Sequence, residues 1–392
     1  MKYAIFSLFG SLLITFLVVR FSHLHSHLSA DHDLNGVQKV HAIPVPRVGG
    51  IGIFFGLALS TALLFLLDAK HAKFALAFML PCSLVFAVGL LEDLTKRVSV
   101  AVRLVVTMIA ALVGCLLLDA TVRSFGIPLI DLVFQVNLVA FFFTVVAVAG
   151  VANAINLIDG FNGLSGFTCV TTLLALAAVG YFVGDDVIRI AALICAAAVA
   201  GFLVWNYPKA KIFLGDGGAY LTGFVIAELA VLLRERNPEV SVLFPLLLVI
   251  YPVFETVFSI YRRKFVRGQS PGAPDAMHLH QLINKRLVRW RDAGQDAPVR
   301  ARGNSMTSPY LWALNLLAVV PAVMFWNDDL FLLGFILLFI ISYVWLYASI
   351  VRFQSPAWLP LPRRPAAAGD EAAVAAADAD AAAARASAMK AD

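Results

Sequence analysis

Apolar residues fill most of the chain in long runs, which short polar segments interrupt. A helix needs about 20 largely apolar residues to cross the hydrocarbon core of a bilayer. Eleven runs of about that length can be marked, and each predicts a transmembrane helix: 3–20, 48–68, 72–91, 100–118, 132–150, 163–183, 187–205, 218–233, 241–261, 309–326 and 330–351. The pattern predicts an all-α, polytopic integral membrane protein, a helical bundle with about eleven transmembrane helices.

Composition supports this class. Of the 392 residues, 61% are hydrophobic and only 14% are charged, which is too apolar for an ordinary soluble domain. We predict one membrane-embedded domain over residues 1–351. The tail, 352–392, becomes Ala-rich from about residue 365 and cannot pack a core, so it is predicted to be a disordered cytoplasmic appendage.

The lysines and arginines predict the orientation, because loops on the cytoplasmic side are enriched in them. With the N-terminus in the periplasm and the C-terminus in the cytoplasm, 23 of the 30 positive residues fall inside. We therefore expect the basic inner face to meet anionic lipid or phosphate rather than nucleic acid. The predicted inner loops are 21–47, 92–99, 151–162, 206–217 and 262–308.

The polar segments all fall on this inner side when the eleven spans alternate in direction. They are KVHAIPVPRVGG (39–50), LEDLTKR (91–97), NAINLIDGFNGLSG (153–166), NYPKAKIFLGDGG (206–218) and a long segment over 262–286. A purely structural protein has no reason to sort polar residues in this way. The pattern therefore predicts an active site at the cytoplasmic membrane surface.

The central segment spaces Asn153, Asn156 and Asp159 three residues apart. An ionisable residue at membrane depth costs roughly 2.5 to 3.5 kcal/mol, so Asp159 is a candidate for function. Three-residue spacing places these side chains along one drifting helical face, where their oxygens suit Mg²⁺. The alternative is a set of helix-capping asparagines before a DG turn.

Two further segments carry carboxylates. Glu92 and Asp93 are adjacent on a helix and point about 100° apart, so we expect them to serve different partners. The alternative is a solvated helix end paired with Lys96 or Arg97. Asp216 lies between glycines in GDGG, which lack the Cβ that would obstruct close approach to a ligand. The alternative there is a tight turn.

His278 and His280 share a face only if their segment is extended, as the proline at 274 favours. Two imidazoles on one side can bind phosphate oxygens, whereas a zinc site would need more ligands than this loop offers. Exposed loop histidines are the alternative. Oxygen ligands, glycines and a basic surface together indicate phosphoryl chemistry on a substrate that reaches the membrane.

Between about Lys39 and Gln281 the motifs resemble those of the polyprenyl-phosphate N-acetylhexosamine-1-phosphate transferases, the MraY/WecA-like family. The matching motifs are KVHAIPVPRVGG, the acidic pair ED, NAINLIDG, FLGDGGAY and HLHQ. The resemblance implies transfer of an N-acetylhexosamine-1-phosphate from a UDP-sugar to undecaprenyl phosphate, which yields the lipid diphosphate sugar and UMP. It also implies Mg²⁺ or Mn²⁺ as cofactor.

The resemblance assigns Asp216 and Asn156 to the metal, Asp159 to the nucleotide site and the two histidines to the diphosphate. Lys39 and His41 match the loop that borders the site. The full set of candidates is Glu92, Asp93, Lys96 and Asp159 as catalytic residues, Lys39, His41, Asn153, His278 and His280 as substrate-binding residues, and Asp216 and Asn156 as metal ligands.

Three residues depart from the family pattern: Glu92 replaces an aspartate, Asn162 stands where a second aspartate is frequent, and Gln281 replaces a histidine. These differences favour a branch that initiates a surface polysaccharide such as O antigen. We expect membrane lipid as a partner, and a homodimer stays open. A transporter of an anionic solute is the alternative function, although its polar groups would be expected at mid-depth in the membrane.

Overall fold

The computed structural model describes residues 1–29, 45–268, 277–288 and 297–352, and every regular element in those ranges is helical. The predicted all-α class is confirmed. Two short π-helical turns are present: Arg262–Val266 follows α12, and Asn284–Val288 follows α13. The helices are α1 Lys2–Arg20, α2 Ser22–Ser29, α3 Gly50–Leu67, α4 Ala69–Thr95, α5 Val100–Leu118, α6 Pro128–Phe134, α7 Asn137–Ile158, α8 Leu164–Phe182, α9 Asp186–Asn206, α10 Gly215–Arg236, α11 Leu243–Leu248, α12 Ile250–Tyr261, α13 Leu279–Ile283, α14 Ala297–Met324 and α15 Asp329–Val351.

Ten helices in the described ranges are long and apolar enough to cross a membrane, and each overlaps one of the predicted runs. The protein is a multi-pass membrane protein. The remaining predicted run, 241–261, is interrupted: α11 ends at Leu248 and α12 begins at Ile250. Pro252 explains the break, because it has no N–H to donate to the carbonyl of Leu248 and its ring collides with that carbonyl. The predicted orientation of the termini stays a prediction.

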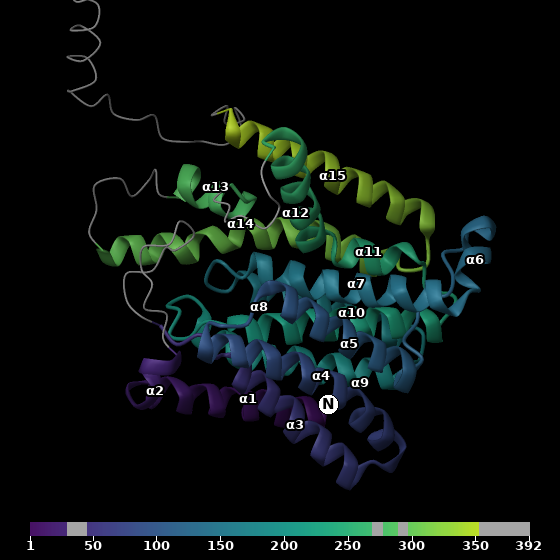
Figure 1. The fold of residues 1–392 in the computed structure, drawn as a ribbon, viewed down its shortest axis with the longest axis horizontal. Helices are drawn as coiled ribbons and strands as arrows, with labels where there is room; N and C mark the ends of the chain where they lie inside the picture. The colour runs from purple at the N-terminus through teal and green to yellow at the C-terminus, as the bar shows by residue number, and fades with distance from the viewer. Residues whose placement is uncertain (30–44, 269–276, 289–296, 353–392) are drawn as a thin grey trace, which may run out of the picture. The chain divides into compact units, whose positions relative to one another are not determined.

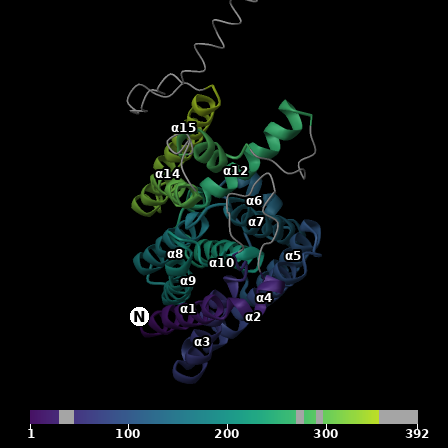
Figure 2. The ribbon, with the colours of Figure 1, turned by 90° about the vertical axis from the view of Figure 1, so that its left-hand side faces the viewer.

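Helix α10 lies in the middle of the bundle that residues 1–347 form (Figures 1 and 2). It packs mainly between α4 and α7, and α3, α5, α8 and α9 also contact it. Eighteen of its 22 residues are buried. A helix that is covered on all sides offers a fixed position for any polar group that it carries.

Polar side chains gather at the beginning of α10. Arg103, in the first turn of α5, and Asn156, near the end of α7, both contact Asp216 in the first turn of α10. Helix α4 ends nearby, since Asp93 also contacts this turn. The fold therefore brings together polar residues from four helices, as the alternating spans predicted.

Candidate active site

Asp216 is the centre of the polar cluster. Its carboxylate accepts a hydrogen bond from the Asn156 amide at 2.8 Å and forms an ion pair with Arg103. A second guanidinium group, that of Arg47, lies 3.8 Å away. The side chain of Asp216 is buried, with 7% of the residue exposed. One carboxylate therefore faces two cationic groups in a site shielded from solvent.

Two arginines of this cluster, Arg103 and Arg47, are not among the site residues predicted from the sequence. Arg103 lies in the first turn of the apolar run 100–118 and is 8% exposed. An ionisable residue at the edge of a membrane span is a signal in its own right. Arg47 belongs to the motif KVHAIPVPRVGG, where Lys39 and His41 were chosen instead; both of these lie outside the described residues.

Asp93 caps the N-terminus of α10. Its two carboxylate oxygens accept the backbone N–H groups of Asp216 at 2.8 Å and Gly217 at 2.9 Å. Such caps satisfy helix-end donors and place negative charge at the positive end of the helix dipole. Asp93 is almost fully buried, at 1% exposed, so solvent screens its charge only weakly.

Glu92 serves a different partner, which confirms that expectation from the sequence. Its carboxylate accepts the backbone N–H of Val98 at 2.7 Å and so closes the turn between α4 and α5. Lys96 follows α4 in the left-handed conformation, with φ of 56°, and its ammonium interacts electrostatically with Asp93. The acidic pair thus supports two backbone segments at the border of the site.

The glycines of GDGG form the first turn of α10 rather than a loop, so the prediction that they clear space for a ligand is wrong for at least two of them. A Cβ on Gly89 of α4 would lie 2.6 Å from the Cα of Gly217, and a Cβ on Gly50 of α3 would overlap the backbone of Gly218. These glycines allow three helix backbones to approach closely, as small residues do in membrane bundles.

Asn153 and Asn156 lie on the last turns of α7, because this helix continues to Ile158 instead of ending before the predicted loop. Asn156 reaches Asp216 directly. Asn153 accepts a hydrogen bond from the Tyr220 hydroxyl at 3.0 Å, and the Tyr220 ring lies 5.4 Å from the Arg103 guanidinium carbon. Asn156 therefore contacts the Asp216 carboxylate, and Asn153 contacts Tyr220, whose ring lies beside Arg103.

Asp159 is the C-terminal cap residue of α7 and accepts a hydrogen bond from the Ser165 hydroxyl. Burial raises the pKa of Asp159 to about 6, although the Ser165 hydrogen bond and the positive charge of Arg47 oppose this shift. A carboxyl group with this pKa changes its charge close to neutral pH. The shared electrostatic contact with Arg47 connects Asp159 to the environment of Asp216.

Asn162 holds the turn after α7 in place. Its side-chain amide donates to the Pro208 carbonyl at 3.0 Å, and its own carbonyl accepts from the Ser308 hydroxyl at 2.6 Å. Its backbone N–H donates to the Asn304 side chain at 3.2 Å. An amide can donate in this way whereas a carboxylate cannot. The residue that departs from the family pattern therefore has a structural function here.

The rings of His278 and His280 lie on one side, but the predicted extended segment is wrong for His280, which belongs to helix α13. His278 precedes α13 with φ −65° and ψ 150°, and the two rings stack with centroids 5.3 Å apart. His280 also meets the ring of Phe161 edge-on at 5.6 Å, and its Nε2 would lie 3.5 Å from a Cβ placed on Gly160. The histidine pair therefore lies beside the turn that follows Asp159.

Among the described residues, no group of three or more His, Cys, Asp or Glu side chains is arranged to hold a metal ion. Asp216 supplies a buried carboxylate, and the Asn156 amide lies beside it with its nitrogen donating to Asp216 Oδ1. Mg²⁺ often takes only one or two carboxylates from a protein, together with water and substrate phosphates. The donor set therefore fits a cation shared with a phosphorylated substrate.

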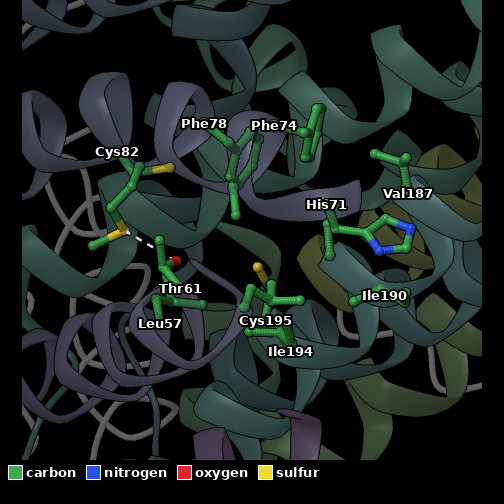
Figure 3. Close-up of a pocket in the computed structure, with 14 residues that line it drawn as sticks. Leu57, Thr61, His71, Phe74, Phe78, Cys82, Val187, Ile190, Ile194 and Cys195 are labelled. Atoms are coloured by element: carbon green, nitrogen blue, oxygen red, sulfur yellow. Dashed lines mark hydrogen bonds between the residues drawn. The ribbon is translucent and has the colours of Figure 1, made fainter. Parts of the chain in front are cut away.

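A small cavity of about 40 Å³ lies among α3, α4 and α9, lined by His71, Phe74, Phe78, Cys82 and Cys195 among others (Figure 3). His71 is hydrogen-bonded to Asp68 at 3.0 Å. His71 and Asp93 stand near opposite ends of α4, about 33 Å apart at about 1.5 Å per residue. This cavity does not belong to the cluster around Asp216.

The amino-acid sequence is similar to known transferases over the region that contains the cluster around Asp216. Residues 75–234 match glycosyl transferase family 4. A decaprenyl-phosphate N-acetylglucosaminephosphotransferase of Mycobacterium tuberculosis is 30% identical over 279 residues, which is 63% of this chain and 67% of the relative. The chain belongs to glycosyl transferase family 4. It is a sugar-1-phosphate transferase.

Two other relatives have names of the same kind. An undecaprenyl-phosphate alpha-N-acetylglucosaminyl 1-phosphate transferase of Thermotoga maritima is 29% identical over 257 residues, 65% of this chain and 73% of the relative. A probable undecaprenyl-phosphate N-acetylglucosaminyl 1-phosphate transferase of Bacillus subtilis is 27% identical over 251 residues, 63% and 67% of the two chains. The family 4 match includes Asp93, Asn156, Asp159 and Asp216 but ends before His278.

Proposed function

We propose that this protein transfers an N-acetylhexosamine-1-phosphate from a UDP-sugar to undecaprenyl phosphate, releasing UMP. The observation that carries the proposal is the carboxylate of Asp216, which is buried in the first turn of α10 and lies beside the guanidinium groups of Arg103 and Arg47. The names of the relatives support polyprenyl phosphate as acceptor, and they make UDP-N-acetylglucosamine the first donor to test.

An apolar cavity of about 550 Å³ supports a polyprenyl acceptor. It lies among α7, α10, α11 and α12, and its lining includes Val249, Val253, Val257 and Ile260. The break between α11 and α12 falls at this cavity. We propose that the prenyl chain lies here, because its apolar surface is removed from water only within protein or lipid. Its phosphate would then extend past Ile260, where Arg262 and Arg263 follow.

Asp216 and the Asn156 amide are the residues that would hold Mg²⁺, or Mn²⁺ in its place, and the bound ion would supply positive charge to the diphosphate. Arg103 and Arg47 add two fixed positive charges on the same side. The proposed substrate contacts of His278 and His280 lie beside the turn after Asp159. A diphosphate in this space would meet cationic groups on several sides, as phosphoryl transfer requires.

We propose in-line attack by an oxygen of the lipid phosphate on the sugar-proximal phosphorus. A new P–O bond forms, the bond to the distal phosphate breaks, and UMP leaves with the electron pair. The second pKa of a phosphate monoester is about 6, so most of the acceptor is dianionic at pH 7 and needs no base. We therefore assign Glu92, Asp93 and Lys96 to the arrangement of the site.

The proposal extends to the cell. The charge distribution supports a cytoplasmic active site in a bacterial inner membrane. Glu92, Asn162 and Gln281 support a branch that initiates a surface polysaccharide such as O antigen. Discrimination among N-acetylhexosamines is assigned to the loop region 262–308.

The test uses the purified full-length protein with undecaprenyl phosphate and UDP-N-acetylglucosamine, and it measures UMP. We expect UMP release that EDTA abolishes and added Mg²⁺ restores, and no release by Asp216→Asn. UDP-linked N-acetylgalactosamine, N-acetylquinovosamine and N-acetylfucosamine form the donor panel. Metal-independent uptake into vesicles without UMP would instead support a transporter.

A further inference from the structure

Glu255 is a buried carboxylate that the mechanism above does not use. It lies on α12, after the break in the span, and is 1% exposed. Its Oε1 accepts the backbone N–H of Leu279 at 3.0 Å and contacts His278 Nδ1 at 3.1 Å. Its Oε2 accepts the Tyr343 hydroxyl at 2.8 Å. One side chain therefore connects α12, the histidine segment and α15.

Packing alone does not account for an acid at this position. Moving a carboxylate out of water costs several kcal/mol unless hydrogen bonds replace its hydration. An apolar residue would fill the space beside Phe254 and Phe258, whose rings already pack on Tyr343 at 5.0 and 5.5 Å. The donors that converge on Glu255 indicate that its oxygens, rather than its volume, are used.

The contact between Glu255 Oε1 and His278 Nδ1 limits the tautomer and the ring orientation of His278. Glu255 accepts the Leu279 N–H at Oε1 and the Tyr343 hydroxyl at Oε2, as an ionised carboxylate does, and an ionised carboxylate can hydrogen-bond to His278 only if Nδ1 carries the proton. A histidine that donates through Nδ1 has its other nitrogen, Nε2, available for a different partner. Because the His280 ring stacks on His278, the orientation of one imidazole also constrains the other.

We infer that Glu255 is a positioning residue: its carboxylate fixes the Nδ1–H tautomer and the ring orientation of His278, so that Nε2 of His278 faces the diphosphate of the nucleotide sugar. This inference rests on the proposed function, in which His278 and His280 bind the diphosphate. Glu255 itself touches no substrate in this arrangement.

The experiment is a double-mutant cycle in the full-length protein with Glu255→Gln, His278→Gln and the double variant. Loss of a group that orients a functional histidine typically costs about 10- to 100-fold in activity. We expect Glu255→Gln to lower kcat/KM by that factor and the double variant to be no worse than His278→Gln alone, because both changes remove the same interaction. Losses that multiply would overturn the inference.

Tyr343→Phe is the matched control, since it removes a donor to the other oxygen and leaves His278 untouched. We expect its kcat/KM to stay within about threefold of wild type, whereas a loss equal to that of Glu255→Gln would indicate a general packing effect. Glu255→Asp keeps the charge one methylene shorter, and partial recovery of kcat/KM relative to Glu255→Gln would support positioning even if the amide variant folds poorly. No recovery in a folded Glu255→Asp would count against it.

UDP-N-acetylglucosamine binding, measured as a shift of the unfolding midpoint, separates this inference from the proposed function. If wild type releases no UMP, the proposed function fails. The positioning role of Glu255 is still supported if Glu255→Gln and His278→Gln both lose the shift of the unfolding midpoint and the double variant loses no more. It is rejected if Glu255→Gln binds the nucleotide sugar as wild type does.

Discussion

Asp93 holds Asp216 by its backbone: one oxygen of the Asp93 carboxylate lies 2.8 Å from the Asp216 amide nitrogen, and the other lies 2.9 Å from that of Gly217. The two aspartates therefore have different relations to the site. Asp216 directs its carboxylate toward Arg103 and Asn156, while Asp93 determines where that carboxylate stands. We therefore expect Asp93 to affect the reaction by fixing the position of Asp216.

Asp93→Asn should destabilise the protein and impair turnover together. The amide leaves one acceptor oxygen for two N–H groups, and an unsatisfied buried group costs about 1 to 3 kcal/mol. We expect a lower unfolding midpoint in detergent and at least a tenfold fall in UMP release. Glu92→Gln is the control, because its single oxygen still accepts the Val98 N–H; an equally large drop in its midpoint would contradict the capping role.

The pH dependence of Glu92→Gln should distinguish arrangement from proton abstraction. A general base is needed less at pH 8 than at pH 6, because the acceptor phosphate is then almost entirely dianionic. We expect the variant to lose the same fraction of turnover at both values. Recovery at pH 8, with Mg²⁺ affinity unchanged, would restore the carboxylate as a base.

Asp159 should contribute to the loss of activity in acid. Its pKa is raised to about 6, so the carboxylate is charged above that value and gains a proton as the pH falls through it. The lipid phosphate gains a proton over the same range. We expect wild-type kcat/KM to fall with a steeper slope between pH 7 and 5 than that of Asp159→Asn, in which the titration of Asp159 is removed and every other group still titrates. Identical slopes would show that the charge of Asp159 does not contribute to kcat/KM.

Asn162→Asp should destabilise the protein instead of restoring a family function. The new carboxylate oxygen would face the Pro208 carbonyl, which the Asn162 amide now contacts as a donor. We expect the unfolding midpoint to fall further in Asn162→Asp than in Asn162→Ala, which removes the hydrogen bond without adding a charge. Higher turnover by Asn162→Asp would show that charge at this position is useful after all.

The sequence predicts the helices well because the length of an apolar run measures a membrane span directly. It does not reveal the break at Val249, since a run such as 241–261 records hydrophobicity and not hydrogen bonding; Pro252 was the available signal. The convergence of Asp93, Asn156 and Asp216 also follows from alternating spans. That argument is geometric and needs no knowledge of the reaction.

Contacts between distant segments could not be read from the sequence. Arg103 resembles any cytoplasmic charge until α5 is packed beside α10. Glu255 resembles a polar residue inside a span until the histidine segment folds back onto α12. The predicted roles of His278 and His280 stay predictions, and those of Lys39 and His41 concern residues outside the described ranges.

The glycines at the start of α10 have a consequence for how this enzyme tolerates change. Gly50, Gly89, Gly217 and Gly218 contribute no functional group, yet the position of the Asp216 carboxylate depends on how closely their backbones approach. A single added methyl group at Gly89 would push α4 and α10 apart and carry the carboxylate with them. The most sensitive positions of this catalyst therefore include residues that have no side chain to lose.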